Sequence, residues 1–138
     1  MINSINLQKI RQLCDKVGYT SRQTEYGDVL VVFDGDERFG NNIGVFFGID
    51  GNNWLQVRGL GGIEIKQDRL AEAIKRINIF NFVNRLMTAY ISESGTVIVE
   101  RYELIDEDVS EEFVLENVIK LSQQLVVDFF RENFADFV

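Results

Sequence analysis

The stretch that decides the fold is VSEEFVLENVIKLSQQLVVDFF, residues 109–130. Its apolar residues recur at intervals of three and four, which predicts a long amphipathic α-helix from Ser110 to about Phe134. Asp108 or Ser110 can cap the N-terminus of this helix, and two glutamates follow in its first turn, where the helix dipole favours acids.

This helix carries more apolar surface than one core requires. Its apolar side chains form two adjacent ridges over roughly half of the circumference, whereas a helix resting on one core needs a stripe of roughly 100°. The first ridge holds Val114, Val118, Leu121, Leu125 and Phe129, and the second holds Leu115, Ile119, Val126 and Phe130. If the first ridge faces the chain's own sheet, the second is predicted to contact a second protomer or a partner protein. Burial of the helix on two sides within its own domain is the alternative.

A second helix is expected upstream, from about Gln67 to Asn78 and at most to Asn84. One of its faces would hold Leu70, Ile74, Ile77 and Asn81. The Asn81 amide would then point into an apolar face, where it must find hydrogen bonds. We expect Asn81 to bond the backbone where the helix gives way to a strand; a ligand contact is the alternative.

The remaining segments are mostly β-rich. A short helix is expected over residues 6–17, with a possible N-cap at Ser4 or Asn6 and a stop at Gly18. Short runs of strand-forming residues separated by turn clusters then predict an antiparallel meander of three or four strands and a later hairpin. These runs are 19–25, 29–34, 43–50, 53–60, 86–92 and 96–104.

The whole chain, residues 1–138, is therefore expected to be a single α+β domain. Its antiparallel sheet would have five to six strands packed with helices, in the order α-β-β-β(-β)-α-β-β-α. No repeat and no Pro-rich or Gly/Ser-rich linker interrupts this order.

A glycine-rich stretch, Gly59-Leu60-Gly61-Gly62, stands where phosphate-binding loops occur, between a strand and a helix. It lacks the Lys-Ser/Thr of a P-loop, and Glu64 occupies the third glycine position of a GxGxxG pattern. We therefore interpret it as a bend that lets the chain leave the sheet.

Two acidic loops raise the question of a metal site. The loop Asp34-Gly35-Asp36-Glu37 fails the EF-hand pattern because Arg38 and Phe39 occupy positions five and six. The cluster Asp106-Glu107-Asp108 is explained by the helix that follows it. We expect no metal and no cofactor.

Composition removes several kinds of chemistry. Among 138 residues there is no histidine and one cysteine, Cys14, so a His-dependent catalytic triad and an ordinary zinc site are excluded. With 22 acidic and 14 basic residues the net charge is -8, which disfavours nucleic acid and anionic membranes as partners. Residues 103–138 hold ten acids and two bases, a net of -8, so the surplus lies around the long helix.

The sequence predicts a cytoplasmic protein. Residues 1–16 lack the pattern of a secretory signal, and no run of about 18 apolar residues suggests a membrane span. A lone Cys14 fits a reducing compartment and is expected to be a small core residue.

Two parts of the sequence resemble the YbjN-like domain: the segment INIFNFVNRLMTAYISESGTVIVERYEL, residues 77–104, and the long helix. This family is also called the bacterial sensory transduction regulator family. The features that match are Phe80-Asn81 at the end of a helix, the hairpin turn at Gly95, and the C-terminal helix. The family is similar in fold to the class I chaperones of type III secretion. The resemblance implies a small, acidic, non-catalytic, often dimeric protein that binds other proteins.

We therefore expect a chaperone-like or regulatory adaptor that acts as a homodimer and binds a further, unidentified protein. A small carboxylate-based enzyme that binds a metal or a metabolite is the alternative.

Overall fold

The computed structural model describes residues 5–51, 53–106 and 108–138. The possible N-cap Ser4, the turn residue Asn52 and the acidic residue Glu107 lie outside the described residues. The elements follow the predicted order, with four strands in the N-terminal meander.

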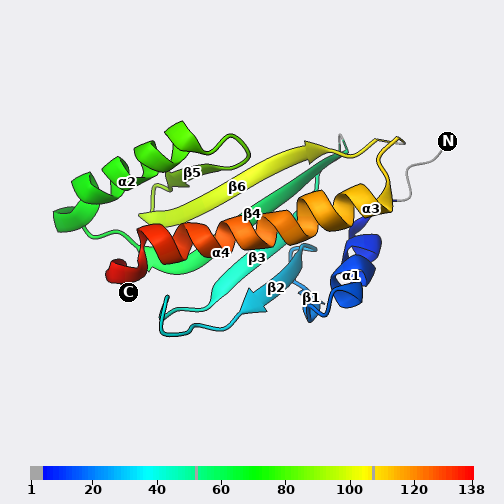
Figure 1. Cartoon of the computed structure of the whole chain (residues 1–138), viewed down its shortest axis with the longest axis horizontal. Helices are drawn as coiled ribbons and strands as arrows, with labels where there is room; N and C mark the ends of the chain where they lie inside the picture. The colour runs from blue at the N-terminus through cyan, green and yellow to red at the C-terminus, as the bar shows by residue number, and fades with distance from the viewer. Residues whose placement is uncertain (1–4, 52, 107) are drawn as a thin grey trace.

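The strands form one six-stranded antiparallel sheet in the order β1-β2-β3-β4-β6-β5 (Figure 1). The strands of the meander are β1 (Ser21–Gln23), β2 (Val29–Phe33), β3 (Ile43–Ile49) and β4 (Trp54–Glu64). The hairpin consists of β5 (Thr88–Ile91) and β6 (Thr96–Leu104), with Gly95 in its turn at a φ of +86°. Strand β6 pairs with β4, so the hairpin joins the meander directly.

The helices lie on one face of the sheet. The C-terminal helix runs diagonally across the strands, α1 (Leu7–Lys16) lies beside its N-terminal end, and α2 (Leu70–Val83) runs along β5 (Figure 1). A 3₁₀ turn, η1 (Gln67–Arg69), leads into α2. The Asn6 side chain caps α1 by accepting a hydrogen bond from the backbone N–H of Lys9 at 2.8 Å.

The C-terminal helix is continuous from residue 111 to residue 133 but changes its winding. It comprises α3 (Glu111–Phe113), the π-helical segment η2 (Val114–Lys120) and α4 (Leu121–Asn133), and η3 (Ala135–Phe137) follows it. The Ser110 hydroxyl accepts a hydrogen bond from the N–H of Phe113, as expected of an N-cap. The π-helical segment was not predicted, because the spacing of apolar residues does not distinguish it from an α-helix.

The core lies between the helices and the sheet, and strand residues alternate between this core and solvent. In β6 the core-facing residues are Val97, Val99 and Arg101, which the sequence pattern alone could not decide. Arg101 is only 6% exposed, and its Nη1 donates to the Asn117 carbonyl in η2 at 2.9 Å. Its Nη2 forms an ion pair with Glu103 at 2.9 Å, so this buried charge is compensated.

The glycine-rich stretch lies inside β4, so its interpretation as an exit bend was wrong. A Cβ on Gly59 would overlap the side chain of Val126, and one on Gly61 would lie 2.7 Å from the ring of Phe130. The two glycines therefore leave the space into which the C-terminal helix packs. Gly62, with a φ of +69°, lies where the register between β4 and β6 shifts.

Candidate protein-interaction surface

The four residues predicted to contact a partner lie in the hydrophobic core. Leu115, Ile119, Val126 and Phe130 are all buried. Val126 and Phe130 face Gly59 and Gly61 of β4, so this ridge is the one that rests on the sheet. On the other ridge, Phe129 packs against Phe80 of α2 with ring centroids 4.6 Å apart. The chain's own elements thus cover both ridges, and a partner surface must be sought elsewhere.

The outer side of α2 is the most apolar exposed helical surface among the described residues. We call Ile74, Ile79, Phe82 and Val83 the α2 surface; their exposed fractions are 44%, 56%, 80% and 69%. A shallow hollow on this side is lined by Ala71, Ile74, Lys75, Asn78, Ile79 and Phe82. Its lining contains one base and no acid, although the chain as a whole carries a net charge of -8.

The sequence of α2 explains why this surface exists. The run INIFNFV, residues 77–83, places apolar side chains all around the helix, while only one side can face the core. Ala73, Ile77 and Phe80 are the buried residues of that side. The predicted apolar face was therefore correct for Ile77 and wrong for Ile74, which points to solvent.

Asn81 lies where α2 gives way to β5. Its Nδ2 donates to the carbonyl of Ala89 at 3.0 Å, and its Oδ1 accepts from the N–H of Ala89 at 2.8 Å. Both polar ends of the amide are thus used by the first strand of the hairpin. In this structure Asn81 connects helix and strand, with no ligand needed to satisfy it.

A groove separates α2 from α4. It is lined by Ile79, Phe80, Val83, Asn84, Leu125, Asp128, Phe129, Glu132 and Asn133, and its volume is about 270 Å³. The apolar residues come from both helices, whereas both acids come from α4. We refer to it as the α2–α4 groove.

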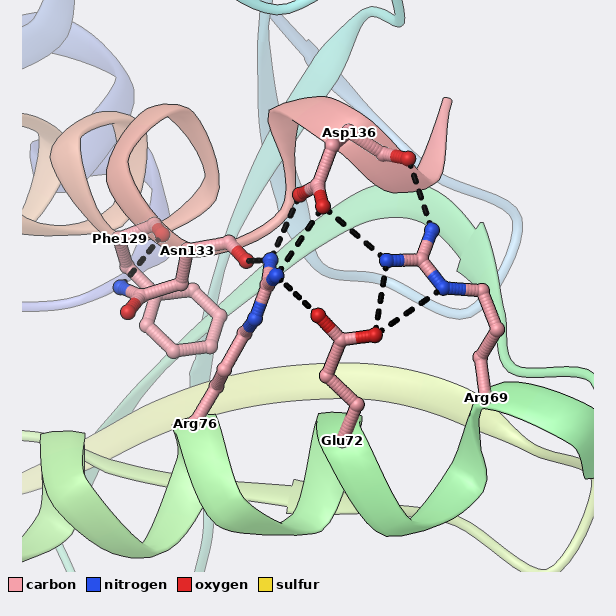
Figure 2. Close-up of polar contacts among 6 residues, drawn as sticks. All are labelled: Arg69, Glu72, Arg76, Phe129, Asn133 and Asp136. Atoms are coloured by element: carbon pink, nitrogen blue, oxygen red, sulfur yellow. Dashed lines mark hydrogen bonds and ion pairs between the residues drawn. The ribbon is translucent and has the colours of Figure 1, made fainter.

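A charged cluster, which we call the latch, lies next to Asn133, one of the residues that line this groove (Figure 2). Its members are Arg69, Glu72 and Arg76 beside or on α2, and Asp136 in η3. The Arg76 Nη1 lies 2.6 Å from Asp136 Oδ1 and donates to the Asn133 carbonyl at 2.7 Å. Arg69 Nη2 lies 3.0 Å from Asp136 Oδ2, and Glu72 pairs with both arginines.

The latch fixes the end of α4 against α2 and leaves neither arginine without a carboxylate partner. The Arg69 guanidinium also stacks 3.6 Å above the centre of the Phe137 ring. Hydrogen bonds from Arg76 and Arg69 hold the pKa of Asp136 well below its usual range. Hydrogen bonding by Arg69 likewise lowers the pKa of Glu72. The cluster is therefore a structural contact, and it holds the groove walls in place.

The face of the sheet away from the helices is a second exposed surface. It presents Val32, Trp54, Tyr102 and Leu104 to solvent. In its centre, Glu100 lies 3.7 Å from Arg58 and accepts a hydrogen bond from the Tyr90 hydroxyl at 3.2 Å. Charges of both signs meet here, so this face selects for no particular partner charge.

The acidic loop around Asp36 has a structural role. Asp36 Oδ1 accepts hydrogen bonds from the backbone N–H groups of Arg38 and Phe39 at 2.8 and 3.1 Å, and Asp36 Oδ2 pairs with Arg131. In the described ranges, no three His, Cys, Asp or Glu side chains are grouped as a metal site requires. Burial, reinforced by Asp15, raises the pKa of the Cys14 thiol to about 11, so it stays protonated at neutral pH. None of the helices described here combines the length and apolarity needed to cross a bilayer.

A six-stranded antiparallel sheet with its helices on one face is the architecture of a YbjN-like α+β fold. The crystal structure of YbjN from E. coli, described as a candidate transcription regulator, superimposes with a TM-score of 0.73. The alignment covers 96% of this chain and 93% of that one at 12% sequence identity. This comparison confirms the fold that the sequence resemblance implied. No protein-family model matches the sequence, and no curated protein matches it either.

Proposed function

We propose that this chain is a non-catalytic protein-binding module, a chaperone-like or regulatory adaptor, and that it acts as a cytoplasmic homodimer. The observation that carries the proposal is the α2 surface, where four large apolar side chains of one helix face solvent. Contiguous exposed apolar patches on monomeric proteins are rarely large and commonly mark interaction sites. The fold shared with YbjN, described as a candidate transcription regulator, supports a regulatory role.

Regulation by this chain would act through proteins. Nucleic acid is bound chiefly through neutralisation of its phosphates, and a net charge of -8 opposes that. The same argument disfavours an anionic membrane surface.

A second copy of the chain is the occupant we propose for the α2 surface. Two copies with a charge of -8 each repel one another, so they associate best through a face free of acids. The hollow around Phe82 meets this condition, since Lys75 is the only charged residue in its lining. A symmetric dimer would bring the Phe82 rings of both copies to one apolar contact.

Light scattering coupled to size exclusion tests the dimer. The wild-type chain should have a mass of about 32 kDa, twice the 15.9 kDa of one chain. Phe82→Asp should reduce it to the mass of one chain with an unchanged circular dichroism spectrum, because it places a charge in the interface. Tyr26→Asp is the matched control, since Tyr26 is 86% exposed in the turn between β1 and β2. A wild-type chain that remains a monomer at every concentration would contradict the proposal.

The alternative of a small carboxylate-based enzyme receives no specific support from the arrangement of the described acids. A thermal-shift screen with divalent metals and metabolites distinguishes it, because a ligand that binds only the folded chain raises the melting temperature.

A further inference from the structure

We propose that the α2–α4 groove is the docking site for a cationic amphipathic helix of a partner protein. The inference rests on the proposed protein-binding function and names the chemistry of the partner. The occupant would have a ridge of Leu-like side chains with Lys or Arg alongside it.

The shape of the groove fits side chains better than a small molecule. Its volume of about 270 Å³ lies just below the roughly 300–1,000 Å³ of typical small-molecule pockets. Phe80, Leu125 and Phe129 contribute apolar surface from both helices, and Ile79 and Val83 extend it to the exposed side of α2. Apolar anchors of a docked helix, spaced by three and four residues, would lie along such a groove.

The charge of the groove selects a cationic partner. Asp128 and Glu132 stand one turn apart on α4, and like charges at this spacing destabilise a helix slightly. Elsewhere on the C-terminal helix, Glu111 pairs with Lys9 and Glu116 pairs with Lys120. Among the described residues, Asp128 and Glu132 form no ion pair, and a cation from a partner would relieve their repulsion.

The latch also connects the two helices that form the walls of the groove. Arg76 bonds the Asn133 carbonyl, so the last turn of α4 is fixed to α2. A preformed groove loses less conformational entropy on binding than one that must be assembled. The site is therefore suited to recognise a helix without rearrangement.

Fluorescence anisotropy with a labelled probe tests the inference. The probe is a short helical peptide of leucine and lysine only, with leucines at every third and fourth position. One control peptide replaces each lysine by glutamate, and another keeps the composition but scrambles the period. We expect the first peptide to bind and both controls to bind at least tenfold more weakly.

Variants then locate the site. Asp128→Asn combined with Glu132→Gln should weaken probe binding by about threefold to tenfold, as the loss of two exposed ion pairs implies. Glu37→Gln combined with Glu93→Gln removes the same charge from remote exposed loops and should have no effect.

Two results would overturn the inference: equal probe binding by the two double variants, or probe-induced amide NMR shifts confined to the acidic pocket of Leu13, Glu112 and Leu115. Light scattering on the same samples separates this outcome from failure of the proposed function. A dimer that ignores the probe refutes the groove assignment alone, whereas a monomer that binds it refutes the dimer alone.

Discussion

The C-terminal helix and α2 are both apolar on more than one side. The chain covers the apolar sides of the C-terminal helix but leaves the outer side of α2 exposed. The C-terminal helix crosses the middle of the sheet, where β4 receives one of its ridges and α2 contacts the other (Figure 1). Helix α2 runs along β5, an edge strand of the sheet, and none of the described residues covers the outer side of this helix. An apolar surplus in a helix therefore stays exposed to solvent only where the topology leaves that side without a neighbour.

The largest expected difference is in stability, between substitution of a phenylalanine in the C-terminal helix and of one in α2. Phe130 is fully buried, so Phe130→Ala should lower the free energy of unfolding by about 3–5 kcal/mol. Phe82→Ala should change it by no more than about 0.5 kcal/mol, because this ring is 80% exposed. Urea unfolding followed by circular dichroism measures both. Low protein concentration keeps any dimer from contributing. Equal losses would remove the distinction between the two helices.

The glycines of β4 provide the next test. Gly59→Ala should cost about 1–3 kcal/mol of stability, because its Cβ would overlap Val126 and lie 2.9 Å from Val99. Val126→Ala in the same chain should recover part of this loss, which a double-mutant cycle would reveal as a coupling energy. Gly51→Ala is the control, since its Cβ would meet nothing within 4 Å. Strict additivity of the two changes would show that Gly59 does not seat the helix.

These glycines mark a limit to what could be predicted about the fold from the sequence. Period and turn signals predicted the three main helices and the six strands to within a few residues, but not the π-helical segment η2 or the 3₁₀ segments η1 and η3. They could not show that Gly59 and Gly61 lie within a strand, because a glycine-rich stretch before a helix is also typical of a loop. The sequence did contain the relevant signal, since glycine in a strand often marks the close approach of another element.

The candidate site was harder to predict for a related reason. The hydrophobic pattern identified a helix with surplus apolar surface, but burial depends on which elements become neighbours. The pattern did not show which ridge of the C-terminal helix would rest on the sheet or what would cover the other. Helix α2 showed no apolar surplus, because Phe82 and Val83 lay near its uncertain C-terminal end. Tertiary contacts such as that between Phe80 and Phe129 decided which surplus was covered.

The two helices also differ in the charged contacts that hold them, and a substitution of Arg101 tests this difference. The C-terminal helix is held by this buried guanidinium, whereas α2 is held by the exposed latch. Arg101→Met should cost about 1–3 kcal/mol, because the Asn117 carbonyl and the Ser122 hydroxyl lose their donor. Arg22→Met, at an exposed position of β1, should have little effect. Equal stabilities of the two variants would mean that Arg101 contributes nothing to anchoring the helix.

The smallest expected effect concerns the latch and depends on pH. The arginines lower the pKa of Asp136 in the folded chain, so its stabilising contribution is complete above the unfolded-state pKa of roughly 3.9. That contribution is lost as the pH falls through the lower folded-state pKa. Asp136→Asn should therefore reduce the melting temperature slightly at pH 7 and equally at pH 5, and the difference from wild type should narrow below about pH 4.

The dependence of the melting temperature on salt distinguishes the exposed latch from the buried contacts of Arg101. The latch carboxylates are about half exposed, so high ionic strength should shrink the effect of Asp136→Asn while leaving that of Arg101→Met largely intact. Asp34→Asn, in the exposed loop between β2 and β3, controls for the loss of one negative charge. A difference between Asp136→Asn and wild type that widens on acidification would mean that the arginines do not stabilise the ionised carboxylate. Asp136 would then contribute nothing to holding α4 against α2.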